Sequence, residues 1–119
     1  MLRLSAGGAG GYGSQVDLGE LVRWAEANAS AQLSDMGDRW KHVQAVAARA
    51  QTAGQALDTE EDRAALLAAA WLHDVGYAPG VAATGFHPLD GARHVRRLGQ
   101  ERVAGLVAHH SAANAEAAL

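Results

Sequence analysis

The chain has 119 residues, a formal net charge of −3 and 49% hydrophobic residues. This length suffices for one domain with a single core and excludes a second catalytic domain. The sequence has no cysteine, which excludes a disulfide framework, a thiolate zinc site and a cysteine nucleophile, and fits a cytoplasmic location. Acidic and basic residues are interspersed, so the charge pattern predicts no nucleic-acid polymer as a partner. No apolar stretch approaches the ~20 residues of a membrane span, so we expect no membrane partner.

Two segments are expected from composition and periodicity. Residues 1–16 are rich in glycine and lack an apolar period, which predicts a flexible lead-in. Residues 17–119 show repeated helical periodicity and predict one all-α domain of five helices. The alanine-rich C-terminal run reaches Leu119 without a capping signal, so the sequence leaves open whether the domain extends further.

The first two helices are predicted from caps and apolar spacing. A capping pattern at residues 17–20 predicts a first helix that ends at about Asn28. Ser34 or Asp35 can open a second helix, in which apolar residues recur at positions 40, 43, 47 and 50. His42 lies beside this apolar stripe, at the expected border between the core and a cleft.

A third helix is predicted from the cap-like Thr59 and the apolar run Ala64–Leu72, with His73 and Asp74 at its end. Successive side chains on a helix diverge by about 100°, so both can reach one point only if it lies between their directions. Gly76 then allows the helix to end.

The C-terminal part is predicted to form a loop and two further helices. Residues 77–86 contain proline and glycine and predict a loop over the end of the third helix. Pro88 suits the first turn of a fourth helix, which places His87 at the mouth of that helix. A fifth helix is expected from about Gln100, and it carries the pair His109-His110, whose side chains diverge by about 100° and need not share a role.

Five of the six histidines and one aspartate form an ordered series along the chain. Imidazole and carboxylate are the ligands that first-row transition metals prefer when thiolate is absent. Because the series is spread over several predicted helices, it indicates a metal site assembled between helices. Its members are His42, His73, Asp74, His87, His109 and His110.

The stretches that carry this series resemble the HD superfamily of metal-dependent phosphohydrolases. They are Arg39-Trp40-Lys41-His42-Val43, Trp71-Leu72-His73-Asp74-Val75-Gly76-Tyr77, Phe86-His87-Pro88-Leu89-Asp90-Gly91-Ala92 and Val107-Ala108-His109-His110-Ser111. The resemblance runs from about Asp17 to the C-terminus and implies a compact HD-type domain. It also implies a metal-binding aspartate on a later helix, and the sequence has no acidic residue beyond Glu116.

The resemblance implies one or two divalent transition-metal ions and hydrolysis of a phosphate ester or nucleotide. A first site would use His42, His73 and Asp74, and a second would share Asp74 and add His87 and His109. His110 is either a further ligand or a packed core histidine. Nitrogen and oxygen ligands favour iron, manganese, cobalt or zinc over magnesium or calcium. Asp74 is the expected catalytic residue, because it would bridge two ions that together activate water and withdraw phosphoryl charge.

Basic residues offer candidate contacts to a small anionic phosphate-containing ligand. Arg93, Arg96 and Lys41 are candidates because basic side chains bind phosphate, while a solvated helix face is the simpler explanation for them. His94 is expected to be a solvated cation near a helix C-terminus. His87 could also act only as a cap before Pro88. The three tryptophans are expected to anchor the core.

Two other functions are compatible with the sequence. Two histidines and one carboxylate are also the ligand set of oxygen-activating iron sites, which would make the chain a di-iron HD-type oxygenase. Without the later aspartate, the chain could instead be a catalytically weakened HD module that binds a metal or ligand for regulation. In that case we expect weak activity and a first site of lowered metal affinity. A homo-oligomer is compatible with both of these functions.

Overall fold

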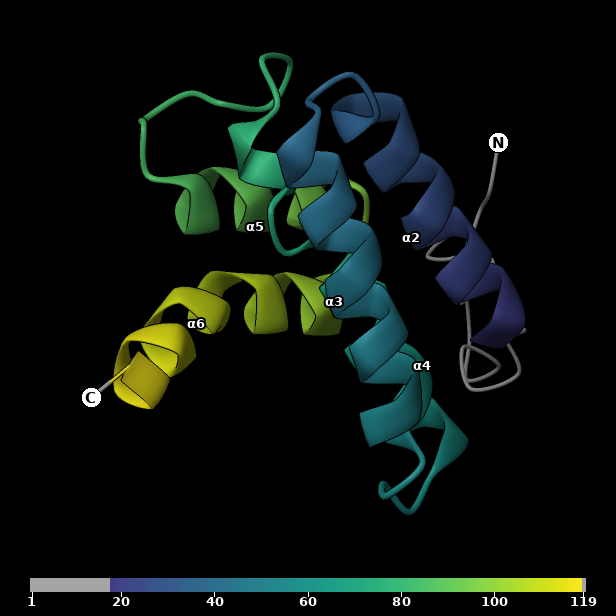
Figure 1. The fold of residues 1–119 in the computed structure, drawn as a ribbon. Helices are drawn as coiled ribbons and strands as arrows, with labels where there is room; N and C mark the ends of the chain where they lie inside the picture. Colours follow the sequence, from purple (N-terminus) through teal and green to yellow (C-terminus); the bar gives the residue numbers. More distant parts are fainter. Residues whose placement is uncertain (1–17, 119) are drawn as a thin grey trace.

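The computed structural model describes residues 18–118, and the side chains of residues 18–109. The predicted lead-in at residues 1–16 therefore lies outside the described residues. The described part contains five α-helices and one 3-10 helix and no strand, which confirms the predicted all-α class (Figure 1). The elements are α2 (Leu18–Leu33), α3 (Asp38–Gly54), α4 (Glu60–Leu72), η2 (Val75–Tyr77), α5 (His87–Arg97) and α6 (Glu101–Ala118).

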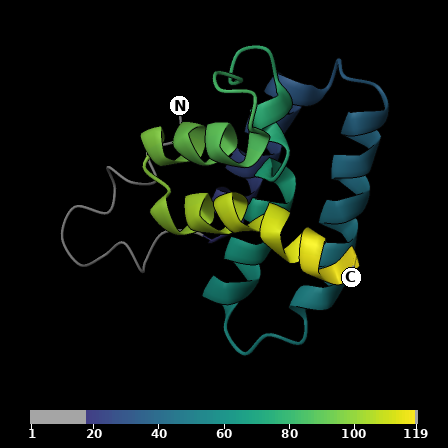
Figure 2. The same ribbon diagram turned by 90° about the vertical axis from the view of Figure 1, so that its left-hand side faces the viewer.

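Helix α4 lies at the centre of the domain. It contacts α2, α3 and α6, while α5 packs along α6 and against η2 (Figures 1 and 2). A helix with neighbours on three sides must be apolar over most of its surface. Helix α4 meets this need with small side chains, since five of its alanines are at most 7% exposed. Small side chains allow neighbouring helices to approach closely, which sets the positions of the residues at the end of α4.

The boundaries of the first helices differ in part from the predicted ones. Thr59 caps α4 as predicted, since its side chain accepts a hydrogen bond from the backbone N–H of Asp62 at 3.0 Å. The end predicted at Asn28 was wrong, because the buried stripe of α2 continues through Ala29 to Leu33. The predicted start of the second helix at Ser34 or Asp35 was also wrong. These residues form a turn that Gly37 completes with a φ of 55°, a left-handed conformation that favours glycine.

The third helix ends before the two metal-ligand candidates at its C-terminus. Helix α4 ends at Leu72, His73 is its C-cap, and Asp74 has a φ of −105° and a ψ of 10°. The expectation that both residues stand on one helix, about 100° apart, was therefore wrong. Leaving the helix frees the chain to turn the two side chains toward the same point.

The expected solvated position of His94 was also wrong. Its side chain is partly buried, and its Nε2 lies 3.1 Å from the side-chain oxygen of Asn28 in α2. Burial, together with the nearby charge of Arg97, lowers the pKa of His94. The tryptophans agree with their prediction, since all three pack partly buried against the core, with the rings of Trp40 and Trp71 5.9 Å apart. None of the described helices combines the length and apolarity that crossing a membrane requires.

Gly76 stands where η2 meets the first turn of α5. A Cβ atom at this position would lie 2.0 Å from the carbonyl oxygen of His87 and 2.8 Å from the backbone nitrogen of Gly91. Backbone atoms cannot move aside as a flexible side chain can. Gly76 was predicted to end the third helix, but that helix ends earlier, at Leu72. The structural role of Gly76 is instead to let the backbone of η2 approach the backbone of α5.

We therefore expect Gly76→Ala to lower the free energy of unfolding by about 2 kcal/mol or more, because the backbone must shift to admit the methyl group. Gly105→Ala in α6 is the control, since no atom lies within 4 Å of its added Cβ. It should leave stability unchanged or raise it by up to about 1 kcal/mol through helix propensity. Urea unfolding followed by circular dichroism measures both. Equal stability of Gly76→Ala and the unchanged chain would contradict the close-approach explanation.

Candidate metal centre

Three side chains, one from α3 and two from the segment that follows α4, bring their candidate ligand atoms together. His42 comes from the first half of α3, and His73 and Asp74 follow directly after α4. The Nε2 atoms of the two histidines are 3.4 Å apart. The Oδ2 atom of Asp74 lies 3.4 Å from Nε2 of His73 and 3.8 Å from Nε2 of His42. Among the described residues these three form the group whose geometry suits a metal ion.

Hydrogen bonding orients the ring of His73. Its Nδ1 lies 2.7 Å from the carbonyl oxygen of Ala70, and a carbonyl can only accept, so Nδ1 carries the proton. In the neutral ring, Nε2 then presents a lone pair toward His42 and Asp74. A backbone carbonyl that fixes the tautomer of a metal-binding histidine is a frequent arrangement around bound metals.

The spacing of the three ligand atoms fits a first-row transition metal. Bonds of about 2.0 to 2.2 Å at tetrahedral angles separate two ligand atoms by roughly 3.3 to 3.6 Å. Two of the three distances lie in this range, and the third is 3.8 Å. The side chain of His42 is 53% exposed, while those of His73 and Asp74 are 10% and 6% exposed. The site therefore has two buried candidate ligands and one at its solvent side.

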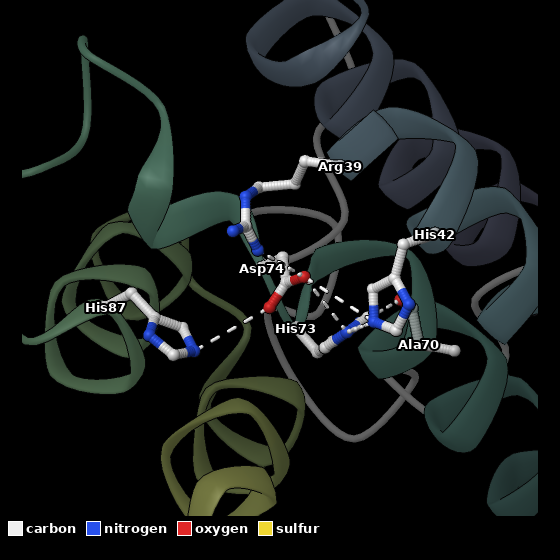
Figure 3. Close-up of polar contacts among 6 residues, drawn as sticks. All are labelled: Arg39, His42, Ala70, His73, Asp74 and His87. Atoms are coloured by element: carbon white, nitrogen blue, oxygen red, sulfur yellow. Dashed lines mark hydrogen bonds and ion pairs between the residues drawn. The ribbon is translucent and has the colours of Figure 1, made fainter. Parts of the chain in front are cut away.

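Asp74 directs its two carboxylate oxygens to different sides. Oδ2 faces His42 and His73, while Oδ1 lies 3.7 Å from Nε2 of His87, the first residue of α5. Figure 3 shows the carboxylate between His87 and the pair of imidazoles. A carboxylate placed this way has the orientation needed to bridge two ions. The expected location of His87 at the mouth of the fourth helix is confirmed.

Arg39 belongs to this site and was missed as a site residue in the sequence. Its Nη1 donates to Oδ2 of Asp74 at 3.2 Å, and the guanidinium carbon lies 3.4 Å from the centre of the Tyr77 ring. Tyr77 in turn stacks on the ring of His87, with 4.0 Å between ring centres. Such a cation–π contact restricts the guanidinium while leaving donors available. In the sequence, the three-residue spacing between Arg39 and His42 could have indicated this role, because it places both side chains on the same face of the helix.

The remaining predicted site residues lie away from this group or outside the residues that the structure describes. His109 lines a cavity together with His42 and His73, and among the described residues it does not join His87 and Asp74 in a ligand group. The side chain of His110 lies outside the described residues. Lys41 and Arg93 are exposed, and Arg96 forms an exposed ion pair with Glu101 at 2.9 Å. Their assignments as ligands or substrate contacts stay predictions.

Asp90, in the first turn of α5, is a second buried acid and was not predicted as a site residue. It is 2% exposed, and its carboxylate accepts hydrogen bonds from the backbone N–H groups of Ala83, Thr84 and Gly85 and from the Thr84 hydroxyl. The bond from Ala83 foremost, and then those from Thr84 and Gly85, hold the pKa of Asp90 below its ordinary value against the opposing effect of burial. Asp90 thus fixes the loop that leads into His87. In the sequence, an acid in the first turn of a helix that follows a loop could have indicated this role, because backbone N–H groups at a helix start favour a carboxylate.

We expect Asp74→Ala to reduce binding of Mn²⁺ or Zn²⁺ by roughly 100-fold or more, because it removes the one anionic ligand shared by both sides of the site. His87→Ala should leave the first ion bound and affect only a second one. Titration of the metal against a chromophoric chelator measures stoichiometry and affinity. His94→Gln is the control, since it removes a histidine that lies outside the ligand group. Full stoichiometry in Asp74→Ala would rule out the bridging role.

Asp90→Asn should destabilise the protein at neutral pH, because an amide cannot accept from all the donors that face this position. A carboxyl whose pKa is lowered by folding stabilises the protein fully above its unfolded value of about 3.9, and this contribution is lost as the pH falls through the folded pKa. The stability difference between Asp90→Asn and the unchanged chain should therefore shrink below about pH 4. Urea unfolding at pH 7 and pH 3 tests this, and a difference that is the same at both values would contradict it.

One comparison with known proteins, the match to a family model, agrees with the geometry of the centre. The family model described as HD domain matches residues 39–117, a stretch that includes all three grouped candidate ligands. No curated protein and no solved structure matches the chain. The family match covers more than half of the sequence, and it includes His42, His73 and Asp74, which the fold brings together. The chain therefore belongs to the HD domain family, a superfamily of metal-dependent, hydrolase-like proteins.

Proposed function

We propose that this chain is a metal-dependent phosphohydrolase that cleaves a phosphate ester or a nucleotide. The observation that supports this most directly is the convergence of the His42, His73 and Asp74 ligand atoms beside the guanidinium of Arg39. Phosphoryl transfer needs positive charge around the phosphoryl oxygens and an oriented water. The candidate centre has residues suited to both needs.

The ligand set points to iron, manganese, cobalt or zinc. Two imidazoles and one carboxylate suit these ions, while magnesium and calcium prefer oxygen ligands. A bound ion of this kind supplies Lewis-acid polarisation of a phosphoryl oxygen and of the attacking water. The Oδ2 atom of Asp74 faces His73 at this centre, and its Oδ1 atom faces His87 on the other side.

The chain's own cation then acts on the substrate. The Arg39 guanidinium is planar and permanently charged, and one of its donors is used by Asp74. Its other donors can bond to phosphoryl oxygens held beside Asp74, which neutralises charge as the bond to the leaving group breaks. The cation–π contact with Tyr77 keeps the guanidinium in place, so little reorientation is required when the substrate binds.

A second candidate function is oxygen activation at iron. Two histidines and one carboxylate that converge with one solvent-facing side are also the ligand pattern of iron oxygenases. Dioxygen uptake by the iron-loaded chain in the presence of organic phosphates or phosphonates distinguishes it. Hydrolysis proceeds equally well without air, whereas oxygenation stops.

The test of the hydrolase proposal is Arg39→Gln, assayed with p-nitrophenyl phosphate in the presence of Mn²⁺. We expect kcat/KM to fall by roughly 100-fold or more, as it does when one preorganised charge-stabilising group is removed. Metal affinity should be unchanged or higher, because the competing partner of Asp74 is gone. A loss of metal binding in parallel with activity would instead assign Arg39 a purely structural role.

Arg96→Gln is the matched control in the same assay. Arg96 is exposed and already paired with Glu101, so removing its charge should change phosphate affinity by less than about 1 kcal/mol. Arg93→Gln should behave in the same way. A tenfold or greater loss in either variant would show that the basic face of α5 contacts the substrate.

A further inference from the structure

A cavity continues from the candidate metal centre between α3, α4 and α6. It has a volume of about 590 Å³. His42 and His73 are among the residues that line it. Helix α3 lines it over successive turns from His42 through Val46 and Ala50 to Ala53. The cavity therefore begins at the metal ligands and extends about three helical turns along α3. Its volume lies within the 300–1,000 Å³ range that is usual for small-molecule sites.

The chemistry of the wall is uneven. Apart from the histidines, the described lining residues are small or aliphatic, with the single exception of Arg49. No aspartate or glutamate is among these lining residues, although the chain as a whole is acidic. The guanidinium of Arg49 forms no hydrogen bond or ion pair with another described residue. Such a wall suits an apolar group that carries an acceptor or a negative charge at one position.

We propose that this cavity holds the leaving group of the substrate, a compact apolar alcohol or phenol esterified to the phosphate, with a carboxylate or another anionic substituent placed against Arg49. This rests on the phosphohydrolase function proposed above. The phosphoryl group then lies at His42, His73 and Asp74, and the ester oxygen points along α3 toward Val46. A bulky, fully hydrophilic leaving group such as a sugar would leave its hydroxyl groups without partners on this wall.

The reaction is balanced in this arrangement. The oxygen of water bonds to phosphorus, the P–O bond to the organic group breaks, and its electron pair goes to the departing alkoxide or phenoxide oxygen. The proton from water ends on that oxygen, which gives the free alcohol and inorganic phosphate. No oxidant or reductant is needed.

Phosphonates separate binding from turnover, because their P–C bond is not hydrolysed. The probes are phenylphosphonate and methylphosphonate, titrated calorimetrically into the Mn²⁺-loaded chain. We expect phenylphosphonate to bind roughly tenfold more tightly or better, since the ring becomes buried. Val46→Phe should bring the ratio of the two affinities close to one without changing the affinity for methylphosphonate. Ala45→Phe, exposed on the same helix and outside the lining, is the matched control and should keep the ratio.

Ala50→Phe, one helical turn beyond Val46 in the cavity lining, provides a second blocking variant, so the test does not depend on a single replacement. For Arg49, the probe is 4-carboxyphenylphosphonate. Arg49→Gln should weaken its binding about tenfold and leave phenylphosphonate unaffected. Equal affinities of the phenyl and methyl compounds in the unaltered chain, no measurable phenylphosphonate binding, or a ratio unchanged by both blocking variants would overturn the proposal.

The two proposals fail in different ways. If the affinity ratio and its loss in Val46→Phe are observed while phenyl phosphate is not hydrolysed, the cavity assignment stands and the hydrolase function does not. If phenyl and methyl phosphate are hydrolysed with equal kcat/KM and the phosphonates bind equally, the hydrolase function stands and the cavity assignment is wrong.

Discussion

The buried carboxylate of Asp74 is the charge around which the described structure is arranged. It is 4% exposed, and an ionised carboxylate is costly to bury unless cations, donors or a metal compensate it. Its neighbours come from three different parts of the chain. Arg39 and His42 come from α3, His73 from the end of α4, and His87 from the start of α5 (Figure 3). A single acid thus lies next to side chains from α3, from the end of α4 and from the start of α5.

Local backbone features place these partners. Helix α4 ends one residue before His73, so the chain turns and both ligands can face one point. The glycine at position 76 lets η2 rest directly on the backbone of α5, and Asp90 holds the loop that precedes it. Both features act on the position of His87, which also stacks on Tyr77. The position of His87 in the site therefore depends on the backbone packing of Gly76 and on the loop held by Asp90, as well as on the contact of its imidazole with Tyr77.

Arg39 relates the charge balance of the site to its proposed chemistry. Without an ion, the guanidinium compensates the charge of Asp74, and the Tyr77 ring keeps it close. If the proposed ion were held by His42, His73 and Asp74, the same guanidinium would be available for an anion at the solvent side, where His42 is the most exposed of the three residues. The apolar cavity starts from this side, so charged recognition of a phosphoryl group and apolar recognition of its organic part would meet at His42 and His73.

The sequence by itself determined the helical class, the existence and order of the helices, and the three candidate ligands that the fold groups. These features follow from apolar periodicity, from the Thr59 cap and from the rarity of charged groups in apolar helices. Tertiary structure alone decided the end of α2, the start of α3, the partners of His94 and Asp90, and the membership of Arg39 in the site. Helix ends depend on whether the next turn is buried by a neighbour, as Leu33 is, and no local pattern encodes that neighbour. The contacts of Arg39 with Asp74 and Tyr77 span 35 or more positions in sequence, so only packing of α3 against the end of α4 could reveal them.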